Sequence, residues 1–153
     1  MAGLVDHIKQ LREETSCGVI ECKKALEEAK GNFGKAKEIL RKRGLEMAAK
    51  KADRVAKEGR VEAYIHHGNK IGVVVEVNCE TDFAARSEDF CAFTKNLAMH
   101  IAAINPQDVP SLLVQPFVKD ASKSIQDLLN ELVAKIGENI QINRFARFKV
   151  GEL

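Results

Sequence analysis

The residues best suited to contact another molecule lie at positions 78–83, in the sequence Asn-Cys-Glu-Thr-Asp-Phe. The carboxylate of Asp82 and the ring of Phe83 stand side by side, directly after a run that is typical of a buried strand. Two interpretations are open. Either Asp82 caps a following helix and Phe83 joins the core, or the pair is exposed. An exposed Phe83 would anchor a partner protein, because aromatic side chains that enter a partner's pocket carry much of the binding energy.

Other residues whose side chains could bind a metal or take part in catalysis are not arranged as such a site. His66 and His67 are zinc-binding types, with Cys79 or Asp82 as further ligands, but neighbouring strand residues point to opposite faces of a sheet. The segments GNFG and HHGNKIG lack the lysine and hydroxyl residue of a phosphate-binding loop. No arrangement of serine, histidine and aspartate is typical of a hydrolase. We therefore expect no metal, no cofactor and no enzymatic reaction.

Length and composition indicate one sizeable globular domain, or a medium domain with a small appendage. The chain has 153 residues, 45% of them hydrophobic, and a net charge of +2. No apolar run approaches the roughly 18 residues of a membrane span, and the N-terminus lacks the apolar core of a signal peptide, so we expect a cytoplasmic protein. Four cysteines without a C-x-x-C pair indicate buried free thiols in a reducing compartment: Cys17, Cys22, Cys79 and Cys91.

Residues 1–44 are expected to form three short helices. Apolar residues recur at helical spacing in all three segments, for example Leu4, Ile8 and Leu11 in the first. Asn32 is the expected N-cap of the third helix, and Gly44 its expected end. Helices this short bury only a small core. This pattern favours a recognition module.

Residues 45–59 are rich in alanine and lysine and are expected to form a semi-rigid, solvent-exposed helical linker. They belong to a longer basic run at 35–60. The default explanation of such a run is a solvated helix face, and the second is a surface that binds nucleic acid or an acidic partner. No aromatic residue that would stack on a base is interleaved with these charges, so nucleic-acid contact is not expected.

Residues 60–153 are expected to form an α+β core. Alternation in RVEAYIHH, a GN turn and the run IGVVVEVNC predict a β-hairpin. Two helices follow, one capped by Ser87 and closed at Asn105, and one running from Ser124 to Gly137, with an irregular connection at 105–123 between them. In the last strand, one face is expected to carry Ile140, Ile142, Ala146, Phe148 and Val150, with Arg144 as an exception and Phe145 interrupting the polar face. We expect one three-stranded antiparallel sheet packed with helices.

Three longer stretches of the sequence are distinctive: LREETSCGVIECKKALEEAKGNFGKAKEILRKRG, VEVNCETDFAARSEDF and LVAKIGENIQINRF. In this order they resemble the elongation factor Ts family of guanine-nucleotide exchange factors for elongation factor Tu. The resemblance implies an N-terminal ubiquitin-associated (UBA)-like three-helix domain at 1–44, the linker at 45–59 and a core at 60–153. Ser16 and Glu21 depart mildly from the family pattern.

The resemblance also implies roles for individual residues. Phe83 would enter the G domain of elongation factor Tu near its Mg²⁺ site, and Asp82, next to Thr81, would disturb the contacts that hold Mg²⁺ and nucleotide. Ile136 and Gly137 would support the same surface. On the N-terminal domain, the residues that would grip a helix of the GTPase are Arg12, Val19 and Ile20.

Two further expectations concern partners. Longer family members carry a second core half, and short members are expected to pair as homodimers. A single three-stranded sheet with one helical layer also leaves a face uncovered. The alternative function is a UBA-like adaptor that binds a partner helix or nucleic acid through residues 35–60.

Overall fold

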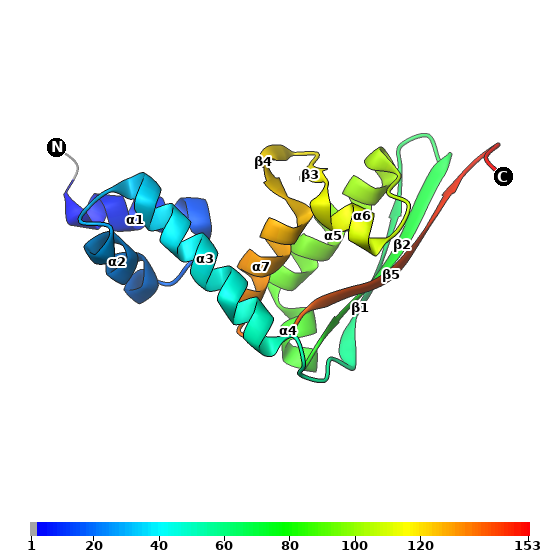
Figure 1. Ribbon diagram of the computed structural model, residues 1–153. Coiled ribbons are helices and arrows are strands. Elements are labelled where there is room, and N and C mark those ends of the chain that lie inside the picture. The colour runs from blue at the N-terminus through cyan, green and yellow to red at the C-terminus, as the bar shows by residue number, and fades with distance from the viewer. Residues whose placement is uncertain (1–2) are drawn as a thin grey trace.

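The computed structural model describes residues 3–153, so residues 1–2 of the expected first domain lie outside it. Figure 1 shows a small group of N-terminal helices joined by a long helix to a core of helices and sheet. The helices are α1 (Leu4–Thr15), α2 (Val19–Glu28), α3 (Phe33–Lys51), α4 (Asp82–Arg86), α5 (Glu88–Ile104), α6 (Val109–Val114) and α7 (Ile125–Ile136). The strands are β1 (Glu58–Ile65), β2 (Ile71–Cys79), β3 (Pro116–Phe117), β4 (Asp120–Ser124) and β5 (Gln141–Lys149). The predicted α+β class is confirmed.

The helices α1, α2 and the first half of α3 enclose a small hydrophobic core of their own. Its fully or nearly buried members are Leu11, Cys22, Ala25, Leu26, Ala29, Ala36 and Leu40. Asn32 caps α3 as predicted, since its side chain accepts a hydrogen bond from the Lys35 amide at 2.9 Å. Of the apolar residues whose spacing predicted the first helix, Leu11 is buried and Ile8 packs against this core, whereas Leu4 is exposed.

The expected end of the third helix at Gly44 is wrong. Helix α3 continues without a break to Lys51, and Gly44 is buried within it. A glycine that ends a helix usually adopts a positive φ, and Gly44 is not among the residues that do so. Gly44 instead faces α7, where the Asn130 carbonyl and Ala134 are its neighbours. The stretch after Gly44 is therefore not wholly solvent-exposed, and Ala48 packs against the main core.

The three-stranded sheet has the order β1-β2-β5, and both pairings are antiparallel, as predicted. The hairpin turn places Gly68 and Asn69 at positive φ, which such turns require. In β5, however, the register shifts between Glu76 and Val77 of the neighbouring strand, which makes a β-bulge.

The bulge corrects the predicted faces of β5. Ile142 points to the core, but beyond the bulge it is Phe145 that packs against the core, whereas Arg144, Ala146 and Phe148 are exposed. Val150, which follows the strand, is exposed as well. The two irregularities noted in the sequence, a charged residue on the apolar face and a phenylalanine on the polar face, are thus the trace of one extra residue.

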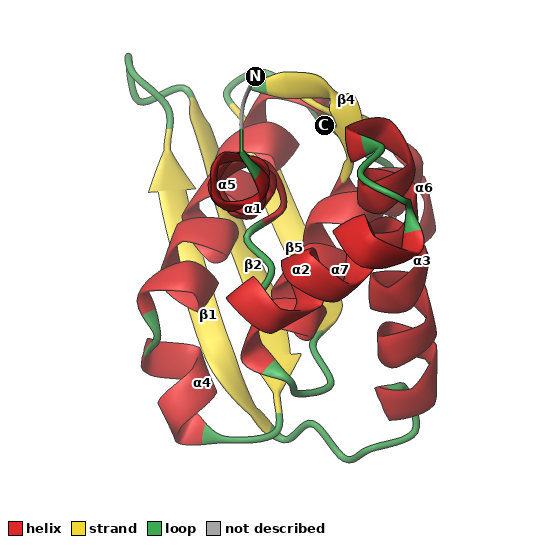
Figure 2. Ribbon diagram, turned by 90° about the vertical axis from the view of Figure 1, so that its left-hand side faces the viewer, coloured by secondary structure: helices red, strands yellow, loops and turns green. Residues whose placement is uncertain are grey.

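Helices cover one face of the sheet. Figure 2 shows α5 and α7 lying across it, and Figure 1 shows the opposite face without a covering layer. Ser87 and Ser124 cap these two helices as predicted. The connection at 105–123 is not irregular: it contains α6 and the β3–β4 hairpin, and Phe117 of β3 belongs to the main core. In the described part of the chain, no helix is long and apolar enough to cross a membrane.

Candidate partner-binding site

Phe83 lies on an exposed corner at the end of β2. Thr81 is the N-cap of α4, because its hydroxyl accepts a hydrogen bond from the Ala84 amide at 3.3 Å. Asp82 is not the cap; its carboxylate pairs with Arg86 one turn further on. The side chain of Phe83 is 91% exposed. The interpretation that places Phe83 in the core is therefore wrong.

The sequence of α4 explains this orientation. Ala84 and Ala85 are buried against the main core, and Cys79 at the end of β2 is fully buried. These small side chains fix the inner side of the single helical turn. Since successive helical residues are about 100° apart, Phe83 is left on the outer side. Among the large apolar side chains of residues 3–152, that of Phe83 has the highest exposed fraction, so it is fully available to a partner.

The second corner follows α7. Ile136 is the last residue of the helix, is half-buried and packs against the main core. Gly137 forms the C-cap in the left-handed conformation, with φ 82°, and its amide donates to the carbonyl of Val133 at 2.8 Å. Ile136 and Gly137 therefore shape and support this corner rather than presenting a large exposed side chain.

The structure joins the two corners through residues that the sequence interpretation missed. The carboxylate of Glu138 accepts hydrogen bonds from the amides of Glu80 (3.0 Å) and Thr81 (2.9 Å) and from the hydroxyl of Thr81 (2.6 Å). In return, the carboxylate of Glu80 accepts from the amide of Asn139 at 2.7 Å. The corner after β2 and the corner after α7 therefore lie side by side.

The position of Glu138 directly after the end of a helix is the feature of the sequence that could have identified it. A carboxylate directly after the C-terminal end of a helix meets the negative end of the helix dipole, which is unfavourable unless another group compensates. An acid at that place therefore indicates a specific partner. No comparable signal identifies Glu80 or Asn139, whose roles depend on the pairing of distant strands.

The end of α3 is fastened to the same corner. The buried side-chain amide of Asn139 donates to the carbonyl of Arg54 at 2.7 Å and to that of Ala52 at 3.4 Å. The ammonium group of Lys51 donates to the carbonyl of Gly137. The segment after the N-terminal helices is thus tied to the two corners of the core.

Arg12, Val19 and Ile20 are exposed residues of the N-terminal helices α1 and α2. Arg12 lies in the last turn of α1, and Val19 and Ile20 are the first two residues of α2, 48% and 68% exposed. Within residues 3–153, no hydrogen bond or ion pair joins them to residues 81–83. The predicted site residues therefore fall into two groups on different parts of the molecule.

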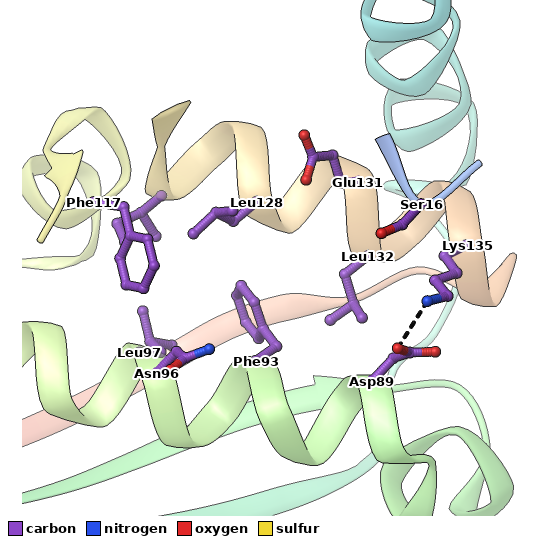
Figure 3. Close-up of a pocket in the computed structure, with 11 residues that line it drawn as sticks. Ser16, Asp89, Phe93, Asn96, Leu97, Phe117, Leu128, Glu131, Leu132 and Lys135 are labelled. Atoms are coloured by element: carbon purple, nitrogen blue, oxygen red, sulfur yellow. Dashed lines mark hydrogen bonds and ion pairs between the residues drawn. The ribbon is translucent and has the colours of Figure 1, made fainter. Parts of the chain in front are cut away.

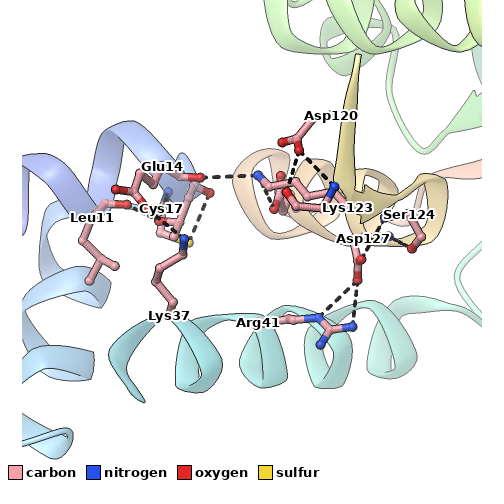
Figure 4. Close-up of polar contacts among 12 residues, drawn as sticks. Leu11, Glu14, Cys17, Lys37, Arg41, Asp120, Lys123, Ser124 and Asp127 are labelled. Atoms are coloured by element: carbon pink, nitrogen blue, oxygen red, sulfur yellow. Dashed lines mark hydrogen bonds and ion pairs between the residues drawn. The ribbon is translucent and has the colours of Figure 1, made fainter. Parts of the chain in front are cut away.

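Polar contacts hold the N-terminal helices against the core (Figure 4). Arg41 of α3 pairs with Asp127 of α7 at 3.2 Å, and Lys123 of β4 donates to the backbone carbonyl of Glu14 at 3.4 Å. The side chain of Glu14 pairs with Lys37 at 2.8 Å, and this hydrogen bond lowers the pKa of Glu14. These contacts orient the two exposed surfaces relative to each other.

A shallow groove between α5 and α7 lies on the helical side of the core (Figure 3). Its walls are largely apolar, with Phe93, Leu97 and Leu132 among them. The charged residues at its rim are already paired, Asp89 with Lys135 at 2.9 Å and Glu131 with Lys123 at 2.9 Å. The groove therefore does not gather free acids, bases or nucleophiles of the kind that catalysis requires.

The histidines of the hairpin turn are not grouped with further metal ligands. His66 contacts the Tyr64 hydroxyl through Nδ1 at 3.0 Å. Cys79 is fully buried at the end of β2, and this burial raises the pKa of its thiol to about 11. In the part of the chain that the structure describes, no three His, Cys, Asp or Glu side chains lie together as a metal site would need.

Comparison with known proteins decides the family. The sequence model of the family described as Elongation factor TS matches residues 4–114 and again residues 80–153. The chain belongs to the elongation factor Ts family. Elongation factor Ts of Acetivibrio thermocellus is 47% identical to this chain over an alignment of 190 positions, which covers 95% of the chain and 88% of that protein. Elongation factor Ts of Caldanaerobacter subterraneus is 45% identical and is covered to 95% of its length.

Membership of the elongation factor Ts family makes the protein a translation elongation factor. The resemblance that its sequence suggested is confirmed. Because the alignments are longer than this chain of 153 residues, the related elongation factors Ts contain residues that have no counterpart here. The Thr81-Asp82-Phe83 corner lies within both matched stretches.

Proposed function

We propose that this elongation factor Ts binds elongation factor Tu and promotes the exchange of its GDP for GTP. The observation that carries the proposal is Phe83, 91% exposed beside Asp82 on a helical turn that is fastened at both ends. As family resemblance implies, the ring enters the G domain of the partner near its Mg²⁺ site. Asp82, which pairs with Arg86 in the free protein, would disturb the contacts that hold Mg²⁺.

The physical basis of such exchange is thermodynamic linkage. A factor that binds the nucleotide-free GTPase more tightly than the GDP-bound form weakens GDP binding by the same ratio. Mg²⁺ bridges the phosphates of the nucleotide to the GTPase, so a disturbance there affects nucleotide affinity strongly. The chain needs no covalent chemistry of its own for this activity, and we propose that it acts as an exchange factor in the cytoplasm.

The N-terminal helices supply the second contact. Their UBA-like arrangement presents Val19 and Ile20 as exposed apolar residues at the start of α2 and Arg12 as an exposed basic residue of α1. Gripping a helix of the GTPase there would hold the partner while Phe83 acts on the nucleotide site. Ile136 and Gly137 would contribute by supporting the corner from which Phe83 projects.

Release of fluorescently labelled GDP from elongation factor Tu tests the proposal. The wild-type chain should accelerate release, and Phe83→Ala should remove most of the acceleration. A matched control is Val114→Ala, which shortens another exposed apolar side chain, 76% exposed at the end of α6. Absence of acceleration by the folded wild-type protein would refute the proposal.

The adaptor alternative is tested in the same experiment. Lys42 and Lys50 are exposed residues of the basic run, and their reversal to glutamate should leave GDP release unchanged. Lys51 is unsuitable for this test because it donates to the carbonyl of Gly137 and its loss would disturb the corner. If the double reversal abolished partner binding and Phe83→Ala did not, the adaptor function would replace exchange.

We also propose that the chain forms a homodimer through the uncovered face of its sheet. Exposed apolar residues gather there from all three strands: Val61 and Ile65 of β1, Val74 of β2 and Phe148 of β5. Glu76 and Arg144 on the same face pair at 2.7 Å, so they leave no net charge to repel a second copy. Residues 80–114 match the family model twice, as expected if the family contains two related core halves and this chain has one.

The mass of the protein by light scattering at micromolar concentration tests this dimer. We expect twice the chain mass of 16.9 kDa for the wild type and a single chain mass for Phe148→Glu, which places a charge in the interface. A monomeric wild type would contradict the homodimer without bearing on Phe83.

A further inference from the structure

We infer that Glu138 is a positioning residue that holds Phe83 in its outward orientation. The inference rests on the proposed exchange function, in which Phe83 is the residue that acts on the partner. Glu138 itself has no need to touch the partner. It acts through Thr81, which begins the helical turn that carries Phe83.

The contacts of Glu138 converge on the two residues between β2 and α4. One carboxylate oxygen accepts from the amides of Glu80 and Thr81, at 3.0 and 2.9 Å, and the other accepts from the Thr81 hydroxyl at 2.6 Å. Hydrogen bonds to an ionised carboxylate are roughly twice as strong as those between neutral groups. Three of them on neighbouring donors fix the course of the backbone at this point.

Thr81 transmits this constraint to α4. Its hydroxyl has a single proton, which goes to Glu138, and one of its lone pairs accepts the Ala84 amide at 3.3 Å. The N-cap is therefore held in one rotamer by Glu138. Phe83 lies between the cap and Ala84, and at 91% exposure its ring has almost no packing to hold it. Its direction depends on the backbone of this turn.

A second, reciprocal contact strengthens the same junction. Glu80 accepts the amide of Asn139 at 2.7 Å and pairs with Arg54 at 3.6 Å. The side chain of Asn139 in turn donates to the carbonyls of Ala52 and Arg54. Two glutamates, Glu80 and Glu138, thus link the corner after β2 to the corner after α7 and to the segment after α3. Only Glu138 contacts Thr81, the N-cap of α4.

The chemistry of Glu138 also argues against a role in its own helix. It directly follows the C-cap Gly137, where a negative charge is unfavourable to α7. Replacing it by a neutral residue should therefore cost α7 little. The compensating interactions are those made with Glu80 and Thr81, which are distant in sequence and belong to the Phe83 corner.

The test compares Glu138→Ala with Glu88→Ala in the GDP-release assay. Glu88 is an exposed glutamate in the first turn of α5, and among residues 3–153 its side chain has no hydrogen-bond or ion-pair partner. We expect Glu138→Ala to lower the maximal rate of GDP release at saturating factor at least tenfold, and Glu88→Ala to leave it unchanged. Thermal melting establishes that each variant is folded, and Glu138→Gln, which preserves volume, serves if the alanine variant does not fold.

A double-mutant cycle separates positioning from a general structural effect. If Glu138 acts through Phe83, Glu138→Ala should cause no further loss in the Phe83→Ala background. Equal losses in both backgrounds, or an unchanged rate for the single variant, would overturn the inference. If instead Phe83→Ala itself had no effect, the proposed function would fail rather than the role of Glu138.

Discussion

Helix α3 runs through Gly44 without a break, and a substitution at this glycine tests that continuity. The sign of the resulting change in the free energy of unfolding is the decisive result. Replacement of Gly44 by alanine adds one methyl group in the middle of the helix. The nearest atoms to that methyl are the Asn130 carbonyl oxygen at 3.8 Å and the Ala134 Cβ at 3.9 Å, which are ordinary van der Waals distances. The substitution therefore fits without displacing α7.

The expected gain follows from helix propensity. Glycine in a helix interior is about 0.8–1.0 kcal/mol less favourable than alanine. Because nothing opposes the added methyl, Gly44→Ala should raise the free energy of unfolding by about 1 kcal/mol. For a chain of this size that corresponds to an increase of about 2–4 °C in Tm.

Gly31→Ala is the matched control. Gly31 has a φ of 79°, and no atom lies within 4 Å of a Cβ built there, so only backbone conformation distinguishes the two substitutions. A side chain in the left-handed region costs about 1–2 kcal/mol, and this variant should be less stable than the wild type. Both free energies are measured by urea unfolding followed by circular dichroism at 222 nm. A loss of about 1 kcal/mol for Gly44→Ala would mean that the helix ends at Gly44 after all, and would refute the reasoning.

Three further predictions concern single side chains. Phe83→Ala should change the free energy of unfolding by less than about 0.5 kcal/mol because the ring is exposed, whereas Phe90→Ala should cost about 3–5 kcal/mol because Phe90 is fully buried; similar losses in urea unfolding would contradict the exposure of Phe83. Burial lowers the pKa of His100 below its ordinary value of 6.5, so the unfolded chain takes up the proton first: stability should be full above that pH and fall as pH drops towards the folded-state pKa, and His100→Gln should flatten this dependence. Cys79, with a pKa of about 11, should react with a thiol reagent at pH 8 only when the protein unfolds, and rapid labelling of the native protein would show that it is accessible.

Local signals in the sequence predicted most elements of the fold. Strand alternation, the Gly68-Asn69 turn and the serine caps of α5 and α7 are short-range features that a few neighbouring residues reveal. The three-stranded sheet followed from them. Gly44 was misinterpreted because a glycine by itself favours a helix end, and the sequence does not reveal that α3 continues past it to pack on α7. The bulge in β5 was visible only as two breaks in an alternating pattern.

The candidate site was predictable in part. The carboxylate of Asp82 next to the ring of Phe83 indicated a contact surface. Only the burial of Ala84 and Ala85, however, decides which way the ring points. Glu138 lies 57 residues after Thr81 in the chain, and the pairing of β2 with β5 brings them together. Contacts that depend on tertiary pairing leave little trace in one sequence.

The central claim, that the ring of Phe83 enters the nucleotide site of elongation factor Tu, is tested most directly by photocrosslinking. Phe83 is replaced by the photoreactive p-benzoylphenylalanine, the protein is irradiated with elongation factor Tu, and the crosslinked peptide is identified by mass spectrometry. The claim predicts a crosslink to the segments of the GTPase that surround Mg²⁺ and the phosphates. A crosslink confined to this chain, or to a surface of the GTPase remote from its nucleotide, would contradict it.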